Sequence, residues 1–299
     1  MLSSLKIRNF SLPESCILSL ESLSYLYPQF FFSMENKPTV VITGAAGGLG
    51  SALCKTYAEN GYQVFAGDLA LSKELQNPLI HQHQLDVTSK ESIINFLDKV
   101  EEGSDSLDLL INNAGISENY PIIVEDPEKT FRMFNINALG SLRMIHFFLP
   151  LLLKARGRII TISSDSVAIP GAFQPYQSSK IALEGLHKAI RQELLIHGIR
   201  MCSVRPGAID TPLLSKVTEN SSMDHILFKK EFEKFRIIAP RFFGRIISPA
   251  QAAKRIFTIS RKKRLPYVCR INHDPIRTLA GILPEKLRDY LVYVKLTRQ

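Results

Sequence analysis

A tyrosine and a lysine lie one helical turn apart in Tyr176-Gln177-Ser178-Ser179-Lys180, at the start of a long amphipathic run. Apolar residues recur at helical spacing through this run, which predicts one helix ending at Gly198: they are Leu183, Leu186, Ile190 and Leu194. Residues i and i+4 share a helix face, so the phenol and the ammonium are expected to point the same way. A phenol has a pKa of about 10, and a neighbouring ammonium lowers it by favouring the phenolate. Tyr176 and Lys180 could therefore exchange a proton with an alcohol or a carbonyl.

A glycine-rich segment near residue 44 has the pattern of a phosphate-binding turn. The β-branched strand Thr39–Thr43 runs into Gly44-Ala45-Ala46-Gly47-Gly48-Leu49-Gly50, and an amphipathic helix follows to Asn60. Glycines let backbone approach a phosphate, and a helix N-terminus offers free N–H groups and the positive end of the helix dipole. Because the order strand, turn, helix is present, we favour a phosphate-binding turn over a purely structural one.

An acidic residue follows the next predicted strand and indicates which dinucleotide would bind. The strand 62–67 ends at Asp68, about where an acidic residue after such a turn accepts hydrogen bonds from the adenosine ribose hydroxyls. A carboxylate there also repels a 2′-phosphate. Positions 47 and 67 are glycines, Gly47 and Gly67, so neither supplies an Arg or Lys side chain that could attract such a phosphate. The sequence therefore favours NAD over NADP.

Strand and helix patterns alternate through the rest of the chain as far as Pro206. Further strands are predicted at 81–87, 107–111, 157–162 and 200–204, and helices at Thr88, where Thr88-Ser89-Lys90-Glu91 reads as a capping box, and from Asp126 to Leu153. Alternation of this kind predicts an α/β fold with a doubly wound parallel sheet in three layers, α/β/α. In such sheets ligands bind beyond the carboxyl ends of the strands. Six polar, glycine or proline positions are expected to meet there: Gly44, Asp68, Asp86, Asn113, Ser164 and Pro206.

These motifs, taken in order, resemble the short-chain dehydrogenase/reductase family, which has a Rossmann fold, over about Pro38 to Cys269. The resemblance rests on Thr43-Gly44-xxx-Gly48-x-Gly50, Asp86-Val87, Asn112-Asn113-Ala114-Gly115, Asn137, Ser164, Tyr176-xxx-Lys180 and Pro206-Gly207-xxx-Thr211. The loop 213–245 and the segment after Cys269 are most similar to members that act on retinols and hydroxysteroids.

The resemblance implies a role for each matching residue. It makes Tyr176 the general acid/base and Lys180 the group that binds the nicotinamide ribose and lowers the pKa of Tyr176. Ser164 would bind the reacting oxygen, and Asn137 would hold a water that relays protons to Lys180. The residues implied at the cofactor are Thr43, Gly44, Gly48, Leu49, Gly50, Asp68, Asp86, Val87, Asn113, Ala114, Gly115, Tyr176, Lys180, Pro206, Gly207, Ile209 and Thr211.

The choice of the catalytic serine needs a further argument. In many family members the spacing between the serine and the tyrosine corresponds to Ser163 in this chain. The strand pattern that begins at Gly157 instead places Ser164, one position closer to Tyr176, at the catalytic position. Side chains alternate across a strand, so only one of the two serines can face the site. We choose Ser164, because the strand motif determines its own end while the following loop can lose a residue.

Composition and charge divide the chain into three parts. Residues 1–33 form an apolar and aromatic N-terminal extension that differs from the rest. We favour a non-native or disordered extension with Met34 as the natural start over a membrane-surface segment or a signal sequence. Residues 34–272 are expected to form one catalytic domain, with a substrate loop at 213–245. The net charge of +9 is a C-terminal property: residues 241–299 hold 14 Lys and Arg against 3 Asp and Glu, a balance of +11. Residues 273–299 form a basic amphipathic segment.

The expected partners follow from these features. Five phenylalanines in the substrate loop predict a hydrophobic alcohol or ketone substrate, such as a steroid, retinoid or other lipid-like molecule, unless they only pack helices: Phe228, Phe232, Phe235, Phe242 and Phe243. The amphipathic C-terminus could pack within the protein or a second subunit, or lie on an anionic membrane. We expect a cytoplasmic homo-oligomer with reduced cysteines, and membrane association as the less favoured outcome.

Other classes of function fit less well. A scaffold or cofactor-sensing protein of the same fold would be expected to lose Tyr176, Lys180 or Ser164, and all three are present. The epimerase-like branch spaces its glycine turn differently. The basic C-terminus lacks an accompanying nucleic-acid-binding motif. His81-x-His83 lacks further ligands, so no metal is expected.

Overall fold

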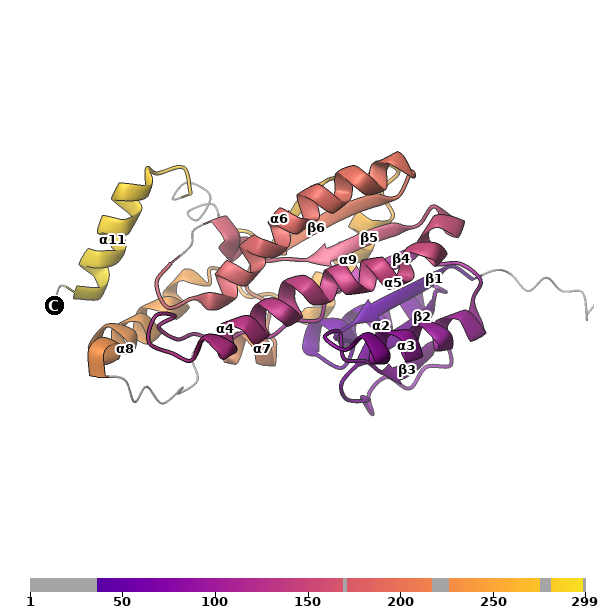
Figure 1. The fold of residues 1–299 in the computed structure, drawn as a ribbon, viewed down its shortest axis with the longest axis horizontal. Helices are drawn as coiled ribbons and strands as arrows, with labels where there is room; N and C mark the ends of the chain where they lie inside the picture. The colour runs from indigo at the N-terminus through magenta and orange to yellow at the C-terminus, as the bar shows by residue number, and fades with distance from the viewer. Residues whose placement is uncertain (1–36, 169–170, 217–225, 275–280, 298–299) are drawn as a thin grey trace, which may run out of the picture. The chain divides into compact units, whose positions relative to one another are not determined.

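The computed structural model describes residues 37–168, 171–216, 226–274 and 281–297. Residues 38–299 form one compact unit built on a seven-stranded parallel sheet (Figure 1). The strands are β1 (Thr39–Thr43), β2 (Gln63–Asp68), β3 (Ile80–Gln84), β4 (Leu109–Asn112), β5 (Arg158–Ile162), β6 (Arg200–Pro206) and β7 (Val268–Ile271). Their order is β3-β2-β1-β4-β5-β6-β7. The chain first adds β2 and β3 on one side of β1, and then adds β4 to β7 in turn on its other side. This is the doubly wound parallel sheet that the sequence predicts.

The central strand β1 contributes to a core on each face of the sheet. Val40 and Ile42 belong to the core on one face and Val41 to the core on the other, because successive side chains of a strand alternate. All three are completely buried. A strand covered on both faces needs apolar side chains on both, and this explains the apolar run 40–42 between the two threonines of β1.

Helices cover both faces of the sheet and give the three layers (Figure 1). On one face α2 (Gly48–Glu59) packs against α9 (Pro249–Ser260), and on the other lie α3 (Lys90–Gly103), α5 (Gly140–Ala155) and α6 (Pro175–Ile196). Before α5 come α4 (Pro127–Phe134) and a single π-helical turn at Asn135–Leu139. The helical run Pro127–Ala155 is long and apolar enough to cross a membrane. Half of its most apolar stretch is, however, buried inside the domain.

Two helices, α9 and α3, differ in how their first turns are capped. α9 begins with a capping box, in which Ser248 and Gln251 each bond the other's backbone. α3 does not begin with the predicted box at Thr88. Its N-cap is Ser89, which accepts from the Ser92 amide, because the Thr88 hydroxyl donates instead to Asp86 at 2.7 Å. The preceding strand is also shorter than predicted, since β3 ends at Gln84.

Short helices follow β6 in the segment 213–245: α7 (Pro212–Ser215) and α8 (Lys229–Ile238), with single 3₁₀ turns around α8. Phe232 and Phe235 of α8 are buried and pack with Phe173, and Phe228 packs against this cluster. Three of the five loop phenylalanines therefore pack helices. Phe243 lines the cavity described below, and the Phe242 side chain lies outside the described residues.

The chain ends in α11 (Glu285–Thr297), which has no buried residue. It packs on α8, and Leu296 contacts the aromatic cluster around Phe173. The predicted extension 1–33 and residues 275–280 of the predicted C-terminal segment lie outside the described residues.

Candidate active site

A cavity of about 380 Å³ lies at the carboxyl ends of the central strands. Fourteen of the predicted site residues line it: Gly44, Gly48, Leu49, Gly50, Asp68, Asn113, Gly115, Ser164, Tyr176, Lys180, Pro206, Gly207, Ile209 and Thr211. They come from the ends of β1, β2, β4, β5 and β6 and from the first turns of α2 and α6. Segments from the two halves of the sheet thus share one site, as expected beyond the carboxyl ends of parallel strands.

The turn before α2 is shaped for close approach of another molecule. Gly44 adopts a left-handed conformation (φ +66°), and a Cβ at this position would lie 2.8 Å from the Ala114 backbone. A Cβ on Gly50 would overlap the Gly44 carbonyl oxygen. Glycine is therefore required at both positions. The turn opens a 12-residue helix, and its residues 47–50 line the cavity, so this helix start fits the pyrophosphate of a dinucleotide.

Asp68 ends β2 beside this turn. One carboxylate oxygen accepts from the Ala46 amide at 2.9 Å and the other from the Ala70 amide at 3.3 Å. The carboxylate is thus held by backbone at the cavity wall, where it can accept further bonds from hydroxyl groups. Asn113 supports the same turn from β4, because its amide nitrogen donates to the carbonyls of Thr43 and Gly44 at 3.0 Å each.

Tyr176 and Lys180 lie one turn apart on the same face of α6, and both line the cavity. The Lys180 nitrogen is 5.8 Å from the centre of the Tyr176 ring and donates to the Ile162 carbonyl at 2.8 Å. Pro175 opens the helix at its first turn, where a missing N–H costs nothing. The first two turns of α6 therefore carry the two groups, and the end of β5 holds the lysine.

Burial dominates the proton equilibria of this pair. It raises the pKa of Tyr176 to about 12, although the neighbouring Ser164 hydroxyl acts to lower it. Burial also lowers the pKa of Lys180 to about 8, against the opposing charge of Glu184. The sequence predicted that Lys180 would lower the pKa of Tyr176. In the structure the pKa of Tyr176 is raised, because the loss of solvation of the phenolate outweighs its favourable interactions.

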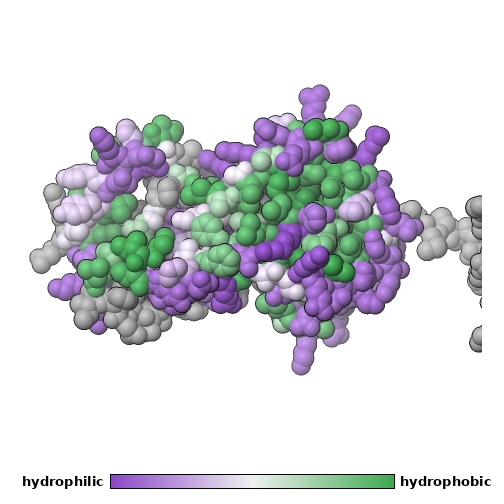
Figure 2. All heavy atoms as spheres, viewed as in Figure 1, coloured by the Kyte–Doolittle hydropathy of each residue, from purple (hydrophilic) through white to green (hydrophobic). Residues whose placement is uncertain are grey.

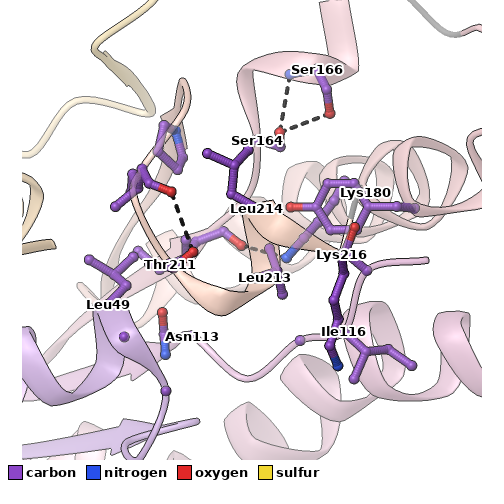
Figure 3. Close-up of a pocket in the computed structure, with 18 of the residues that line it drawn as sticks. Leu49, Asn113, Ile116, Ser164, Ser166, Lys180, Thr211, Leu213, Leu214 and Lys216 are labelled. Carbon is purple, nitrogen blue, oxygen red and sulfur yellow. Dashed lines mark hydrogen bonds between the residues drawn. The ribbon is translucent and has the colours of Figure 1, made fainter. Parts of the chain in front are cut away.

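The two candidate serines face different surroundings. Ser164 contacts Tyr176, and its hydroxyl lies 2.8 Å from that of Ser166 at the cavity wall (Figure 3). The Ser163 side chain is almost completely buried and lies near Glu184. Both serines are among the residues that line the cavity, and Ser164 is the one that contacts Tyr176. The catalytic role of Ser164 stays a prediction.

Asn137 lies in the π-helical turn and joins three segments. Its oxygen accepts from the Ile116 amide at 2.8 Å, and its nitrogen donates to the Ile116 carbonyl and to the Ser179 hydroxyl, each at 2.9 Å. Ser179 in turn donates to the Tyr176 carbonyl. Asn137 therefore ties the first turn of α6 to the segment after β4, next to Lys180.

Five predicted site residues do not line the main cavity: Thr43, Asp86, Val87, Ala114 and Asn137. The Thr43 hydroxyl accepts hydrogen bonds from the Asn113 and Ala114 amides, so it links the end of β1 to the segment that follows β4. Asp86 accepts from the amide and the hydroxyl of Thr88 and so caps the loop after β3. Their direct contact with a cofactor stays a prediction.

Sequence reasoning assigned no site role to several other cavity residues: Gly47, Ile116, Ser117, Asn119, Ile162, Ser166, Gln174, Gln177, Ala208, Pro212, Leu213, Leu214 and Lys216. Some had a local signal, because Gly47 lies within the glycine turn and Ile116 directly follows the Asn-Asn-Ala-Gly motif. Leu213 and Leu214 fall in the predicted substrate loop, but no motif singles them out. They reach the cavity only because α7 folds over it.

Comparison with known proteins shows the family: the chain belongs to the short-chain dehydrogenases, whose family pattern matches residues 38–222. An uncharacterised oxidoreductase of Bacillus subtilis is 30% identical over 232 residues, which are 74% of this chain and 82% of the relative. A short-chain dehydrogenase of Streptomyces avermitilis has a similar fold, with a TM-score of 0.71 at 22% identity over 88% of this chain and 98% of the other. The alcohol dehydrogenase of the archaeon Thermococcus sibiricus, solved with 5-hydroxy-NADP, has a TM-score of 0.65 at 23% identity over 79% and 96%.

Family membership defines the class of reaction. The protein is an oxidoreductase that acts on CH–OH groups and uses a nicotinamide dinucleotide. The glycine turn and the carboxylate of Asp68 fit the pyrophosphate and a ribose of such a cofactor.

Proposed function

We propose that the protein interconverts a hydroxyl and a carbonyl group on an apolar small molecule, with Tyr176 as general acid/base and NAD as the preferred cofactor. One observation carries the proposal: Ser164, Tyr176 and Lys180 line the same cavity as the glycine turn and Asp68. A proton-transfer group and a dinucleotide cradle that open into one cavity can act on one substrate.

The cofactor supplies the hydride acceptor or donor when it is bound. Ser164 donates a hydrogen bond to the reacting oxygen and orients it toward Tyr176. During reduction the Tyr176 hydroxyl gives its proton to that oxygen, and during oxidation the phenolate takes the proton. The Lys180 ammonium favours the phenolate and holds a ribose hydroxyl, while its bond to the Ile162 carbonyl orients it.

The lining of the cavity supports an apolar substrate. Carbon-rich side chains extend from several elements around it: Ile116, Ile162, Leu213, Leu214 and Phe243. Figure 3 shows Leu213 and Leu214 of α7 beside the catalytic groups. Polar side chains at the same cavity, among them Asn119 and Gln174, could bind a second oxygen of the substrate. Such a mixture suits a molecule with an apolar body and few polar groups.

The preference for NAD rests on charge. The Asp68 carboxylate stands at the cavity wall, held by the Ala46 amide, and would repel a ribose 2′-phosphate. The archaeal structure with 5-hydroxy-NADP belongs to a protein of 23% identity and supports only a shared fold. For this chain the carboxylate favours the cofactor without the phosphate.

A homo-oligomer in the cytoplasm is the proposed state. Four apolar residues of α5 and α6 are exposed: Leu142, Leu153, Ile181 and Leu195. Figure 2 shows hydrophobic side chains gathered over the face where these helices lie. An exposed apolar face of this kind suits contact with a second copy. Membrane contact through the C-terminal segment stays the less favoured proposal.

A substrate screen tests the proposed function. Purified protein would be incubated with a panel of secondary alcohols and ketones, steroids and retinoids included, with NAD(H) and NADP(H) side by side, while the absorbance of the reduced nicotinamide is followed. We expect turnover of apolar substrates with NAD, and none by a Tyr176→Phe variant. Turnover by that variant at the wild-type rate would contradict the proposed role of Tyr176.

A further inference from the structure

A buried carboxylate behind the cavity links helix α6 to strand β6. Glu184 is 6% exposed. Its two oxygens accept from the Arg205 guanidinium, from Nε and from Nη2, at 2.9 Å each. Ser203 donates to the same carboxylate at 2.5 Å. An arginine fork on a carboxylate fixes the direction of both side chains as well as their separation.

Both ends of this link adjoin residues that line the cavity. Glu184 lies one helical turn after Lys180, and Lys180 lies one turn after Tyr176, on the same face of α6. Arg205 directly precedes Pro206 and Gly207, which line the cavity at the end of β6. The ion pair therefore joins the wall that carries the proton-transfer groups to a wall that is expected to contact the cofactor.

The titratable and charged groups around the pair come from four elements. Helix α6 contributes Tyr176, Lys180, His187 and Arg191, and β6 contributes Arg205. The 3₁₀ turn after β5 brings Asp165, which lies 3.9 Å from Arg270 of β7.

Among these groups, the arginine of β6 decides the charge of Glu184. Burial raises the pKa of Glu184, but its hydrogen bonds from Arg205 and Ser203 outweigh burial and lower the pKa to about 2. Glu184 is thus ionised at neutral pH. Its negative charge opposes the loss of the proton from Lys180.

We infer that Glu184 and Arg205 are positioning residues for the reaction: they hold Lys180 in place and charged, and they fix α6 against the cofactor-facing end of β6. The inference rests on the proposed role of Lys180. Neither residue touches the reacting atoms. Their effect on turnover passes through the lysine and through Pro206 and Gly207.

Glu184→Gln tests the inference, because it removes the charge and nearly preserves the shape. We expect kcat to fall about tenfold and the alkaline limb of its pH profile, where Lys180 loses its proton, to move to lower pH by about half a unit or more. Cofactor affinity, measured by quenching of NADH fluorescence, should fall as well. Glu184→Asp keeps the charge and should return the alkaline limb toward its wild-type position.

Arg158→Gln is the matched control for loss of a structural arginine. Arg158 begins β5 at the opposite end of the sheet and donates to the carbonyls of Ser260 and Lys262. We expect this variant to lose thermal stability while its pH profile and kcat stay within twofold of wild type. Should Glu184→Gln fail to fold, Arg205→Lys is judged by the same criteria. Lysine keeps the positive charge but cannot make the paired hydrogen bonds that the Arg205 guanidinium makes to Glu184.

Two results separate this inference from the proposed function. In one outcome, Glu184→Gln or Arg205→Lys loses stability but keeps kcat and cofactor affinity within twofold of wild type, with the alkaline limb at the wild-type pH. The link is then structural only and the inference is wrong. If Lys180→Met and Tyr176→Phe also keep wild-type turnover, the proposed mechanism itself fails.

Discussion

The side chain of Lys180 donates a hydrogen bond of 2.8 Å to the backbone carbonyl of Ile162. This bond joins the second turn of α6 to the end of β5, just before Ser164. Because Lys180 is 4% exposed, its position is set by the protein and not by solvent. The lysine and the serine for which we propose catalytic roles thus belong to one junction between a strand and a helix.

Tyr176→Phe should lower kcat at least a hundredfold, because it removes the only atom of the side chain that can transfer a proton. General acid–base catalysis contributes about 10² to 10⁴ in rate. The affinity for NAD should stay near that of wild type, since the ring is retained. Steady-state kinetics and cofactor titration measure the two effects; a folded variant with nearly normal turnover would show that Tyr176 is not the acid/base.

Ser164→Ala should reduce turnover far more than Ser163→Ala. Ser164 lies beside Tyr176, while Ser163 is buried near Glu184. The Ser163 variant should instead show its effect in the melting temperature. Comparing kcat and melting temperature for both variants checks the assignment, and the reverse ranking in kcat would identify Ser163 as the catalytic serine.

Asp68→Asn should narrow the preference for NAD over NADP by about tenfold in kcat/KM, which corresponds to about 1.4 kcal/mol. The amide keeps an acceptor for the Ala46 N–H and removes the charge that repels a 2′-phosphate. Asp68→Ala, which also removes the acceptor, serves as the comparison for effects on the turn. A wild-type enzyme that prefers NADP would refute the role assigned to Asp68.

His187 should make the protein sensitive to mild acid. Burial lowers the pKa of His187 to about 4, so between about pH 4 and 6.5 the unfolded chain binds a proton that the folded chain does not. The free energy of unfolding should therefore fall as the pH drops from about 6.5 to about 4, by up to about 3 kcal/mol from this group. Urea unfolding across this range should show a shallower loss for His187→Gln; equal slopes for the two proteins would argue against a neutral, buried imidazole.

The full-length protein should stay in the supernatant when it is sedimented with anionic liposomes, at low and at high salt. Leu296 packs against the aromatic cluster of the domain, and α11 carries nearly balanced charge among its described residues. A version that ends at Asn272 is the control. Binding that disappears both with this truncation and with salt would instead establish membrane association through the basic C-terminal segment.

Local patterns were sufficient to predict much of the fold and part of the site. The buried run Thr39–Thr43, the glycine turn and the amphipathic run of α6 each depend on neighbouring residues alone, and the structure contains all three. The capping box at Thr88 was wrong for a local reason as well: the threonine hydroxyl had a better acceptor in the nearby Asp86.

The amino-acid sequence by itself determined the alternation of strands and helices, the order of the motifs and the shared helix face of Tyr176 and Lys180. These follow from the periods of strands and helices, which need no knowledge of distant segments. Only the tertiary structure decided that Glu184 meets Arg205, that Leu213 and Phe243 reach the cavity, and that burial raises the pKa of Tyr176. Contacts and burial depend on which segments pack together in space, and packing is a property of the whole folded chain, not of any stretch of it.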